Sequence, residues 1–332
     1  VEELATNLIG VKIASEKINK LKAKQMPISD EEVELFKENL PFKLTNAQER
    51  TIKEISDDIS LSKPMRRLVQ GDVGSGKTVV AAVSMYISAK NNTQSVLLCP
   101  TEVLAEQHFK NFSAWFKNSN IKIELLTGKM PVSKRRGIYQ DLEDGVIDIL
   151  IGTHAVFQDK VKMKNLGLVV VDEQQRFGVK QRFDLVKKSS DQIMPHQLFM
   201  TATPIPRTLA MTIFADLETS KIDELPPGRK PVETLVYSDK KKDEIVKRLE
   251  TVCKSGNQVF WLCTMIEESE NLDVQAADEA KEWIKENTNG LNIGLVHSKL
   301  SKDQRDKAIE NFRSGKTLSL IHISEPTRLG FI

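Results

Sequence analysis

Residues 71–78 read Gly-Asp-Val-Gly-Ser-Gly-Lys-Thr, which is the spacing of a phosphate-binding loop. Glycines let such a loop curl until several backbone N–H groups point at phosphate oxygens, at the start of a helix whose dipole favours anions. In this chemistry Lys77 reaches the β and γ phosphates of a nucleoside triphosphate, and the Thr78 hydroxyl binds Mg²⁺. The residues predicted to bind the nucleotide with this loop are Gly71, Asp72, Gly74, Ser75, Gly76, Lys77 and Thr78.

Two acidic residues, Asp172 and Glu173, follow an apolar run further along the chain. Open parallel sheets bind ligands at the carboxyl ends of their strands, so an acidic pair at such an end has a defined role in a phosphate-loop enzyme. We expect Asp172 to hold Mg²⁺, directly or through water, and Glu173 to orient and deprotonate the attacking water. The sequence therefore predicts catalytic roles for Lys77, Asp172 and Glu173.

Two weaker segments fit the same nucleotide site. Thr201-Ala202-Thr203 supplies two hydroxyls in a sharply turned loop that continues to Arg207, where they are placed to sense the γ phosphate and the acidic pair. Phe42 and Gln48 lie upstream at a distance suited to an adenine clamp, because a phenyl ring stacks on a base and an amide offers both a donor and an acceptor. Taken singly, threonine loops and isolated phenylalanines are more often ordinary turn and core residues. The order of the segments along the chain favours the functional interpretation.

The elements that position these residues can be predicted from the apolar runs. From residue 41 to 222, short Val/Ile/Leu runs alternate with longer amphipathic stretches, which is typical of parallel strands covered on both faces. We therefore expect an α/β fold, with strands that include residues 95–99, 147–151, 166–171 and 197–200. Residues 1–40 show helical spacing of Leu and Ile with almost no strand character, which predicts a helical lead-in.

A hinge is predicted at residues 223–231, where three prolines and one glycine prevent regular structure. Residues 232–317 then alternate strand and helix patterns again, with strands expected at 234–237, 258–263 and 292–296 and a charged helix at 240–249. This second domain carries no phosphate loop of its own. Gly315-Lys316-Thr317 repeats the end of the motif, but the position five residues before Gly315 is Glu310.

Composition sets wider limits on the class of protein. The chain of 332 residues is too long for one ordinary core, and its formal net charge of +2 neither demands nor excludes a nucleic-acid partner. Its three cysteines lack the paired spacing of a disulfide framework or a zinc site, and no signal peptide or membrane-spanning apolar run is visible. These observations favour a two-domain cytoplasmic protein without membrane association.

Taken together, the motifs resemble those of the superfamily 2 helicases, and among these the RecG-type ATP-dependent DNA helicases that remodel branched DNA. The resemblance is specific and covers roughly residues 1–317. The segments that carry it are residues 71–78, 100–108 (Pro-Thr-Glu-Val-Leu-Ala-Glu-Gln-His), 152–155 (Gly-Thr-His-Ala), 172–179 (Asp-Glu-Gln-Gln-Arg-Phe-Gly-Val), 201–212 (Thr-Ala-Thr-Pro-Ile-Pro-Arg-Thr-Leu-Ala-Met-Thr), 223–231 and 265–270 (Met-Ile-Glu-Glu-Ser-Glu).

The resemblance implies two tandem RecA-like domains of the phosphate-loop NTPase class. Such proteins use ATP and Mg²⁺ to act on DNA forks and four-way junctions in recombination and repair, here as a monomer in the bacterial cytoplasm. The resemblance also implies that three loops line the DNA backbone, where hydroxyls and backbone N–H groups contact phosphates without reading sequence. The DNA contacts so implied are Thr101, Glu102, Thr127, Gly128, Thr153 and His154. For Thr101, capping of the helix that begins at Glu102 is an equally good explanation.

Two substitutions depart from the family pattern. Gln175 stands where the family has histidine in the acidic motif. A glutamine still hydrogen-bonds, so we expect Gln175 to serve the catalytic site and ATP binding to survive, while coupling of hydrolysis to DNA movement stays open. Ser298 follows His297 where the family has glycine, and serine lacks the backbone freedom of glycine at that turn.

The ends of the chain depart further. Residues 318–332 do not resemble the family and are predicted to be a non-native tail, such as a translated adapter, although the apolar residues 318–323 favour a strand. The family's N-terminal wedge domain and its C-terminal motifs, which include an arginine finger, are then missing, and the second domain is truncated. Removing a finger arginine typically costs about 10³–10⁵ in rate, so we expect this chain to bind ATP and to hydrolyse it very slowly.

Two alternatives remain open at this point. One is a translocase of the transcription-repair coupling factor type, which binding to RNA polymerase would favour. The other is a nucleotide-binding switch without motor activity, which Gln175 and the missing finger motif favour. A switch is not expected to respond to branched DNA, whereas a motor is.

Overall fold

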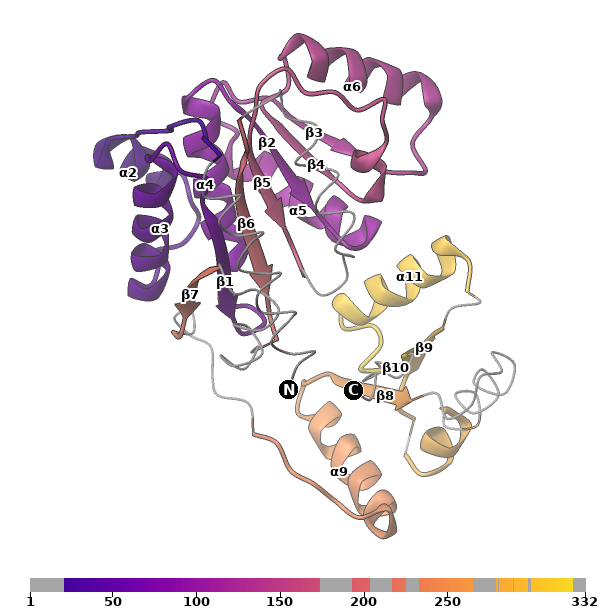
Figure 1. Cartoon of the computed structure of the whole chain (residues 1–332). Helices are drawn as coiled ribbons and strands as arrows, with labels where there is room; N and C mark the ends of the chain where they lie inside the picture. The colour runs from indigo at the N-terminus through magenta and orange to yellow at the C-terminus, as the bar shows by residue number, and fades with distance from the viewer. Residues whose placement is uncertain are drawn as a thin grey trace, which may run out of the picture. The chain divides into compact units, whose positions relative to one another are not determined.

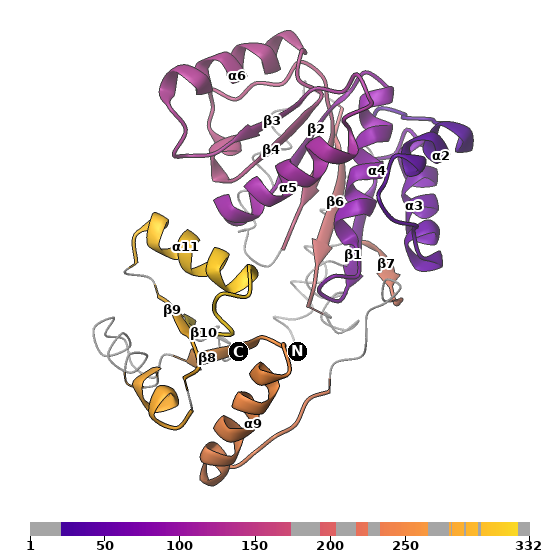
Figure 2. The same cartoon turned by 180° about the vertical axis from the view of Figure 1, so that it is seen from behind.

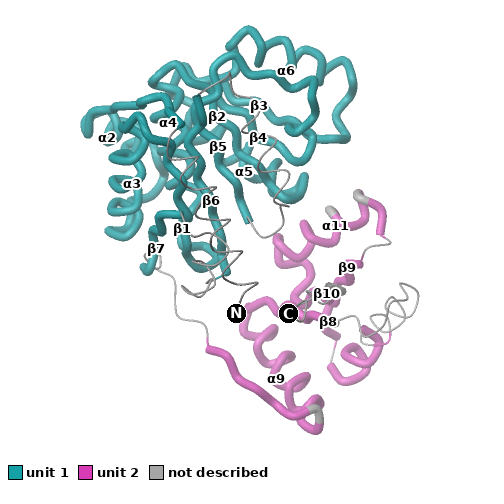
Figure 3. The backbone as a smooth tube through the Cα atoms, viewed as in Figure 1, with its two compact units in different colours: residues 1–230 teal, residues 231–332 magenta. Residues whose placement is uncertain are grey.

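The computed structural model describes residues 21–173, 193–203, 217–224, 233–264, 279, 281–288, 290–297 and 300–324. The chain divides into two compact units, residues 1–230 and 231–332, and the division falls inside the range predicted as a hinge (Figure 3). Each unit holds a parallel β-sheet with helices packed on it, so the α/β class with two parallel sheets is confirmed (Figure 1).

Seven strands form the described sheet of the first unit, in the order β3-β4-β2-β5-β6-β1-β7. Every neighbouring pair is parallel, so all seven strands end at the same edge. The strands are β1 (Arg66–Gly71), β2 (Gln94–Leu98), β3 (Ile123–Leu126), β4 (Ile149–Gly152), β5 (Leu166–Val171), β6 (His196–Thr201) and β7 (Glu218–Ile222).

Both faces of this sheet are covered, as its continuous apolar strands require. Successive side chains of a strand point to opposite faces, and Leu97 of β2 accordingly joins one core cluster while its neighbours Val96 and Leu98 join the other. Helices α3, α4 and α5 pack against the first face, and α6 contributes Ile138 and Leu142 to the second (Figures 1 and 2). The helical elements are α2 (Asp30–Glu38), α3 (Asn46–Ile59), α4 (Lys77–Lys90), α5 (Glu102–Trp115), α6 (Val132–Asp144) and the 3₁₀ turn η1 (His154–Phe157).

The described part of the lead-in belongs to the first unit's core. No helix forms over residues 21–29, where the leucine and isoleucine spacing favours one. Pro27 disfavours helical angles at Met26 and lacks the N–H that a helix interior needs. The Met26 N–H donates to the Ile59 carbonyl over 2.9 Å, and the Met26 side chain is fully buried. The lead-in becomes helical only at α2, where the Ser29 hydroxyl accepts from the Glu32 N–H.

The second unit is smaller. Its described sheet has three parallel strands in the order β8-β10-β9. The strands are β8 (Val259–Thr264), β9 (Ile293–Val296) and β10 (Ser319–Ser324), and the named helical elements are η3 (Asp239–Lys241), α9 (Lys242–Lys254) and α11 (Lys302–Arg313). The strand expected at 234–237 is not there. These residues pair with no described strand, and Val236 is 95% exposed, so nothing in the described part of the chain supplies the burial that stabilises a β-branched segment as a strand.

The strand expected near residues 318–323 is confirmed as β10, which lies between β8 and β9. The burial of Leu320 and Ile321 matches the apolar pattern that predicted it. A backbone ladder forms with any apolar segment of suitable length, so the foreign origin of residues 318–332 stays a prediction.

Candidate nucleotide-binding site

The topology brings the predicted nucleotide residues to one edge of the large sheet. Strands β5, β6 and β1 are neighbours, and they end at Val171, Thr201 and Gly71. The acidic pair, the threonine loop and the phosphate loop begin at those three strand ends. Residues separated by about a hundred positions in the chain therefore come together where parallel sheets bind ligands.

The phosphate loop has the backbone that its glycines allow. Gly74 and Gly76 have positive φ angles of 76° and 87°, which other residues rarely adopt. A Cβ atom on Gly76 would also lie 2.2 Å from the Gln48 amide nitrogen. Helix α4 starts at Lys77 directly after this turn, so its first N–H groups face the loop and form an anion site.

Lys77 is held inside the loop. Its ammonium donates to the carbonyl oxygens of Gly71 and Asp72, over 2.7 and 2.9 Å. Burial lowers the pKa of Lys77, against the opposing effect of the carboxylates of Glu173, Asp172 and Asp72. A cation surrounded by carbonyl oxygens and carboxylates is suited to exchange them for phosphate oxygens.

The acidic pair is built with a strained backbone. The Asp172 carboxylate is nearly buried, and its Oδ1 accepts from the Glu173 N–H over 3.1 Å. Glu173 has a φ of +50°, a left-handed conformation that costs of order 1–3 kcal/mol for a residue with a side chain.

His108 of helix α5 belongs to the site, although sequence reasoning did not find it. Its Nε2 lies 2.9 Å from Oδ2 of Asp172, and the residue is buried. The residues are 64 positions apart, and only the adjacency of β2 and β5 brings α5 over the end of β5. In the sequence, the only indication of this role of His108 is that a polar residue occupies an apolar-face position of the helix that follows β2.

Hydrogen bonds within the threonine loop join Thr201 to Thr203. Thr201 is fully buried, and its hydroxyl lies 3.0 Å from the Thr203 hydroxyl and accepts from the Thr203 N–H. Ala202 stands between them at the end of β6. Gln175 and Arg207 lie outside the described residues, as do residues 225–231 of the predicted hinge.

In the predicted adenine clamp, the Gln48 amide bonds to the protein itself. Its Oε1 accepts from the Thr45 N–H in a capping box, and its Nε2 donates to the Ser75 carbonyl in the phosphate loop over 2.8 Å. Both ends of the amide therefore already bond to the protein and tie α3 to the loop. Phe42 is 44% exposed and meets Trp115 edge-on at 5.9 Å, which leaves ring surface for stacking.

The residues predicted to contact DNA share the same sheet edge, after strands β2, β3 and β4. Thr101 caps α5 through its hydroxyl, which accepts from the Leu104 N–H, so the capping explanation holds for the described contacts. Glu102 pairs with Lys129 over 2.9 Å, beside Gly128, whose Cβ position lies 3.8 Å from a Glu102 oxygen. The remaining positions, at the ends of β3 and β4, are Thr127 and Thr153, which are buried, and His154, which is exposed.

The donor set fits Mg²⁺ bound together with phosphates. Magnesium takes one or two protein oxygens and completes its shell with phosphate and water, and Thr78 and Asp172 are groups of that kind. In the described part of the chain, no three His, Cys, Asp or Glu side chains gather into a metal site of their own. No described helix is long and apolar enough to cross a membrane.

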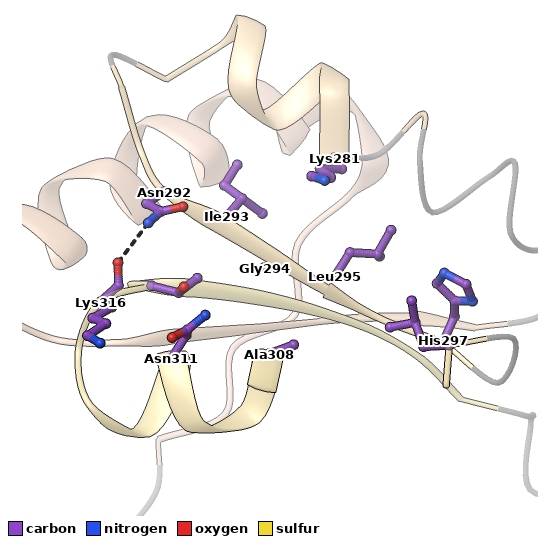
Figure 4. A pocket seen from close by; sticks show the side chains of 11 residues that line it. Lys281, Asn292, Ile293, Gly294, Leu295, His297, Ala308, Asn311 and Lys316 are labelled. Atoms are coloured by element: carbon purple, nitrogen blue, oxygen red, sulfur yellow. Dashed lines mark hydrogen bonds between the residues drawn. The ribbon is translucent and has the colours of Figure 1, made fainter. Parts of the chain in front are cut away.

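The second unit contains a cavity of about 530 Å³ (Figure 4). It lies between β9 and α11, and its polar lining includes Lys281, His297, Asn311 and the Asn292 amide, which donates to the Lys316 carbonyl over 2.8 Å. No carboxylate occurs among its described lining residues, and none of the predicted nucleotide residues lies there. The predicted nucleotide residues that the structure describes therefore all lie in the first unit.

Family comparisons agree with this division. The DEAD/DEAH box helicase family matches residues 45–212, which include the phosphate loop, the acidic pair, the threonine loop and the predicted DNA contacts. The helicase conserved C-terminal domain matches residues 240–324. That second match continues seven residues past 317, where the resemblance was expected to end, and it takes in β10.

Similar proteins are recorded as ATP-dependent DNA helicase RecG. The protein from Haemophilus influenzae is 46% identical over 283 residues, covering 85% of this chain and 41% of the relative, and that from Aquifex aeolicus is 44% identical over 312 residues, covering 94% and 39%. A solved RecG bound to a three-way DNA junction matches 97% of this chain and 42% of that one, with 34% identity and a TM-score of 0.76. The helicase MrfA, at 16% identity and a TM-score of 0.64, shares the fold. The chain thus spans about 40% of the length of these relatives.

Proposed function

The chain belongs to the DEAD/DEAH box helicase family, and we propose that it is the ATP-driven motor part of a RecG-type DNA helicase that remodels branched DNA. One observation carries the proposal. The phosphate loop, the acidic pair and the predicted DNA loops follow neighbouring strands and lie along a single sheet edge. An enzyme that couples a nucleotide to a DNA backbone needs that proximity, and a RecG homologue solved on a three-way junction supports DNA as the partner.

In the proposed reaction the chain's own residues position and activate the reactants. Lys77 and the N–H groups at the start of α4 bind the β and γ phosphates, and Phe42 stacks on the adenine. Thr78 and Asp172 would hold Mg²⁺, which would neutralise charge on the phosphate oxygens. Glu173 takes a proton from the water that attacks the γ phosphorus as the bond to the bridging oxygen breaks and ADP leaves.

DNA binding in this proposal uses the loops after β2, β3 and β4, which present hydroxyl, amide and backbone groups to phosphates. The two units act as the tandem motor domains, with residues 223–231 as the hinge and ATP binding as the signal for closure. Forks and four-way junctions are the proposed substrates, in a bacterial cytoplasm. A nucleotide-binding switch is the second candidate, because Gln175 replaces the histidine expected in the acidic motif.

ATP turnover tests the proposal. It is measured for this chain and for a longer protein completed at both ends, each with and without a model replication fork. We expect slow turnover by the chain and fork-stimulated turnover by the longer protein, reduced about 10²–10⁴-fold by Glu173→Gln. Glu310→Gln on α11 serves as the matched control and is expected to change little. Turnover by the longer protein that is the same with and without the fork would favour the switch and reject the motor.

A further inference from the structure

A side-chain contact joins the two halves of the sheet edge, beside the backbone hydrogen bond from the Asp172 N–H to the Leu98 carbonyl. The nucleotide half follows β5, β6 and β1, and the predicted DNA half follows β3, β4 and β2. Strands β2 and β5 are the neighbours at which these halves meet. His108, on the helix that follows β2, reaches across this boundary to Asp172 at the end of β5, over 2.9 Å.

The Asp172 carboxylate is fixed from two sides. Its Oδ1 accepts from the Glu173 N–H, and its Oδ2 lies against Nε2 of His108. A carboxylate held by two donors keeps one orientation, whereas removal of either donor frees its rotation. For a metal ligand this matters, because partners of the ligands set their direction and mutation of such partners typically costs 10–100-fold in metal affinity.

The position of the His108 ring depends on helix α5. Its Nδ1 is buried and has no hydrogen-bond partner in the described structure, so Nε2 makes its one polar contact there. The ring packs edge-on against Phe112 at 6.5 Å, and Phe112 stacks on Phe116 at 5.7 Å. Packing of α5 therefore orients the imidazole that orients Asp172.

The same helix begins at the predicted DNA loop. Thr101 caps its first turn and Glu102 is its first residue. A helix is stiff over two turns, so a displacement of this end by a bound DNA backbone moves His108 with it.

We propose that His108 is a positioning residue that sets the Asp172 carboxylate for Mg²⁺ and transmits the state of the DNA-contacting end of α5 to the nucleotide site. The inference rests on the proposed function. An ordinary buried histidine on α5 would stabilise the fold but would alter neither the Mg²⁺ requirement of nucleotide binding nor the response to DNA.

The first test measures binding of a fluorescent ATP analogue to this chain over a range of Mg²⁺ concentrations. His108→Phe keeps a ring against Phe112 and removes the donor, and we expect it to raise the Mg²⁺ concentration for half-maximal binding about 10-fold or more. His108→Gln, whose amide nitrogen reaches the position of Nε2, should restore most of the wild-type behaviour. Leu142→Ala on α6, which is buried in the core cluster on the other face of the sheet, is the packing control, expected to lower the unfolding temperature and leave the Mg²⁺ dependence unchanged.

The second test measures the ratio of ATP turnover with and without fork DNA in the longer protein, where His108→Phe should lower the ratio several-fold. His108→Leu replaces His108→Phe if the latter does not fold, as judged by circular dichroism. If the wild-type protein shows no stimulation by DNA, the proposed function fails. If the wild type is stimulated and the folded variants keep both its ratio and its Mg²⁺ dependence, or if His108→Gln behaves like His108→Phe, the role of His108 is rejected.

Discussion

The two units use the same parallel-strand design and differ in how much of the sheet they bury. The first unit packs helices on both faces of seven described strands, and its two core clusters run through almost every strand. In the second unit, the described core cluster consists of Val246, Ile284, Ile293 and Ile321. Loops that hold charged ligands need fixed strand ends, which agrees with the position of the predicted nucleotide residues on the better-covered sheet.

The tripeptide Gly-Lys-Thr occurs in both units, and its position relative to a helix differs between them. Gly76-Lys77-Thr78 opens helix α4, where free N–H groups favour anions. Gly315-Lys316-Thr317 follows the end of α11 and leads into β10, where free carbonyl groups favour cations. The same three residue types therefore favour phosphate binding at the N-terminus of α4 and disfavour it after the C-terminus of α11.

Core truncation gives the largest expected difference between the units. Leu97→Ala empties space in the fully buried centre of the first unit and should cost about 2–5 kcal/mol, lowering its unfolding temperature by roughly 5–15 °C. Ile321→Ala should cost less, near the lower end of the same range, because its half-buried neighbours Trp261 and Leu295 can collapse into the gap. Scanning calorimetry checks this, with each substitution expected to move the transition of its own unit. Equal shifts would show that the two cores tolerate truncation equally well.

Replacing a glycine within a strand of each sheet is expected to change stability less than core truncation does. A Cβ on Gly152 would lie 2.5 Å from the Leu126 carbonyl oxygen, whereas a Cβ on Gly294 would meet the end of the Leu320 side chain at 2.8 Å. Backbone yields less than a side-chain tip, so we expect Gly152→Ala to cost about 1–3 kcal/mol and Gly294→Ala under about 1 kcal/mol. Urea unfolding of both variants measures these costs. A larger cost at Gly294 would mean that the second sheet is the more rigid one.

The smallest predicted effect is a pH dependence confined to the first unit. His196 is fully buried, its Nδ1 accepts from the Met65 N–H over 3.0 Å, and its Nε2 donates to the Lys24 carbonyl over 2.7 Å. Burial lowers the pKa of His196, against the effect of the Lys24 carbonyl. As pH falls, the unfolded chain therefore takes up a proton at His196 before the folded chain does. The stability that neutral His196 contributes is complete above the ordinary histidine pKa of about 6.5. It is lost as pH falls from there towards the lower pKa of the folded protein.

His196→Gln keeps an acceptor and a donor but does not titrate. Thermal unfolding between pH 5 and 8 should show a shallower loss of stability for the first unit of this variant than for the wild type. The same slope in both proteins would show that other groups cause the acid sensitivity.

Local signals in the sequence were sufficient for the phosphate loop and for the buried strands, because glycine spacing and apolar runs act over a few residues. Strand β7 has the polar sequence Glu-Thr-Ser-Lys-Ile and β3 is short and half-buried, so neither showed such a run. The isolated segment 234–237 had the right residue types for a strand and no described partner. Strand formation at these places depends on neighbours that a local pattern does not contain.

The site contacts that were missed are those between distant segments. The residue types did not indicate that His108 would meet Asp172, because that contact depends on the order of β2 and β5. The two protein contacts of the Gln48 amide, with the Ser75 carbonyl and the Thr45 N–H, were likewise not indicated, and its role in reading adenine stays a prediction. Topology and turn geometry decided both outcomes.

Isothermal titration calorimetry of this chain with a slowly hydrolysed Mg-ATP analogue measures how many nucleotides bind and, with variants, which unit binds them. We expect one nucleotide per chain, bound by the first unit. Lys77→Ala should weaken binding by about 10- to 100-fold, because hydrogen bonds from a charged group to the phosphates are lost, and Lys316→Ala should leave binding unchanged. A second bound nucleotide, or loss of binding in Lys316→Ala but not in Lys77→Ala, would contradict the account.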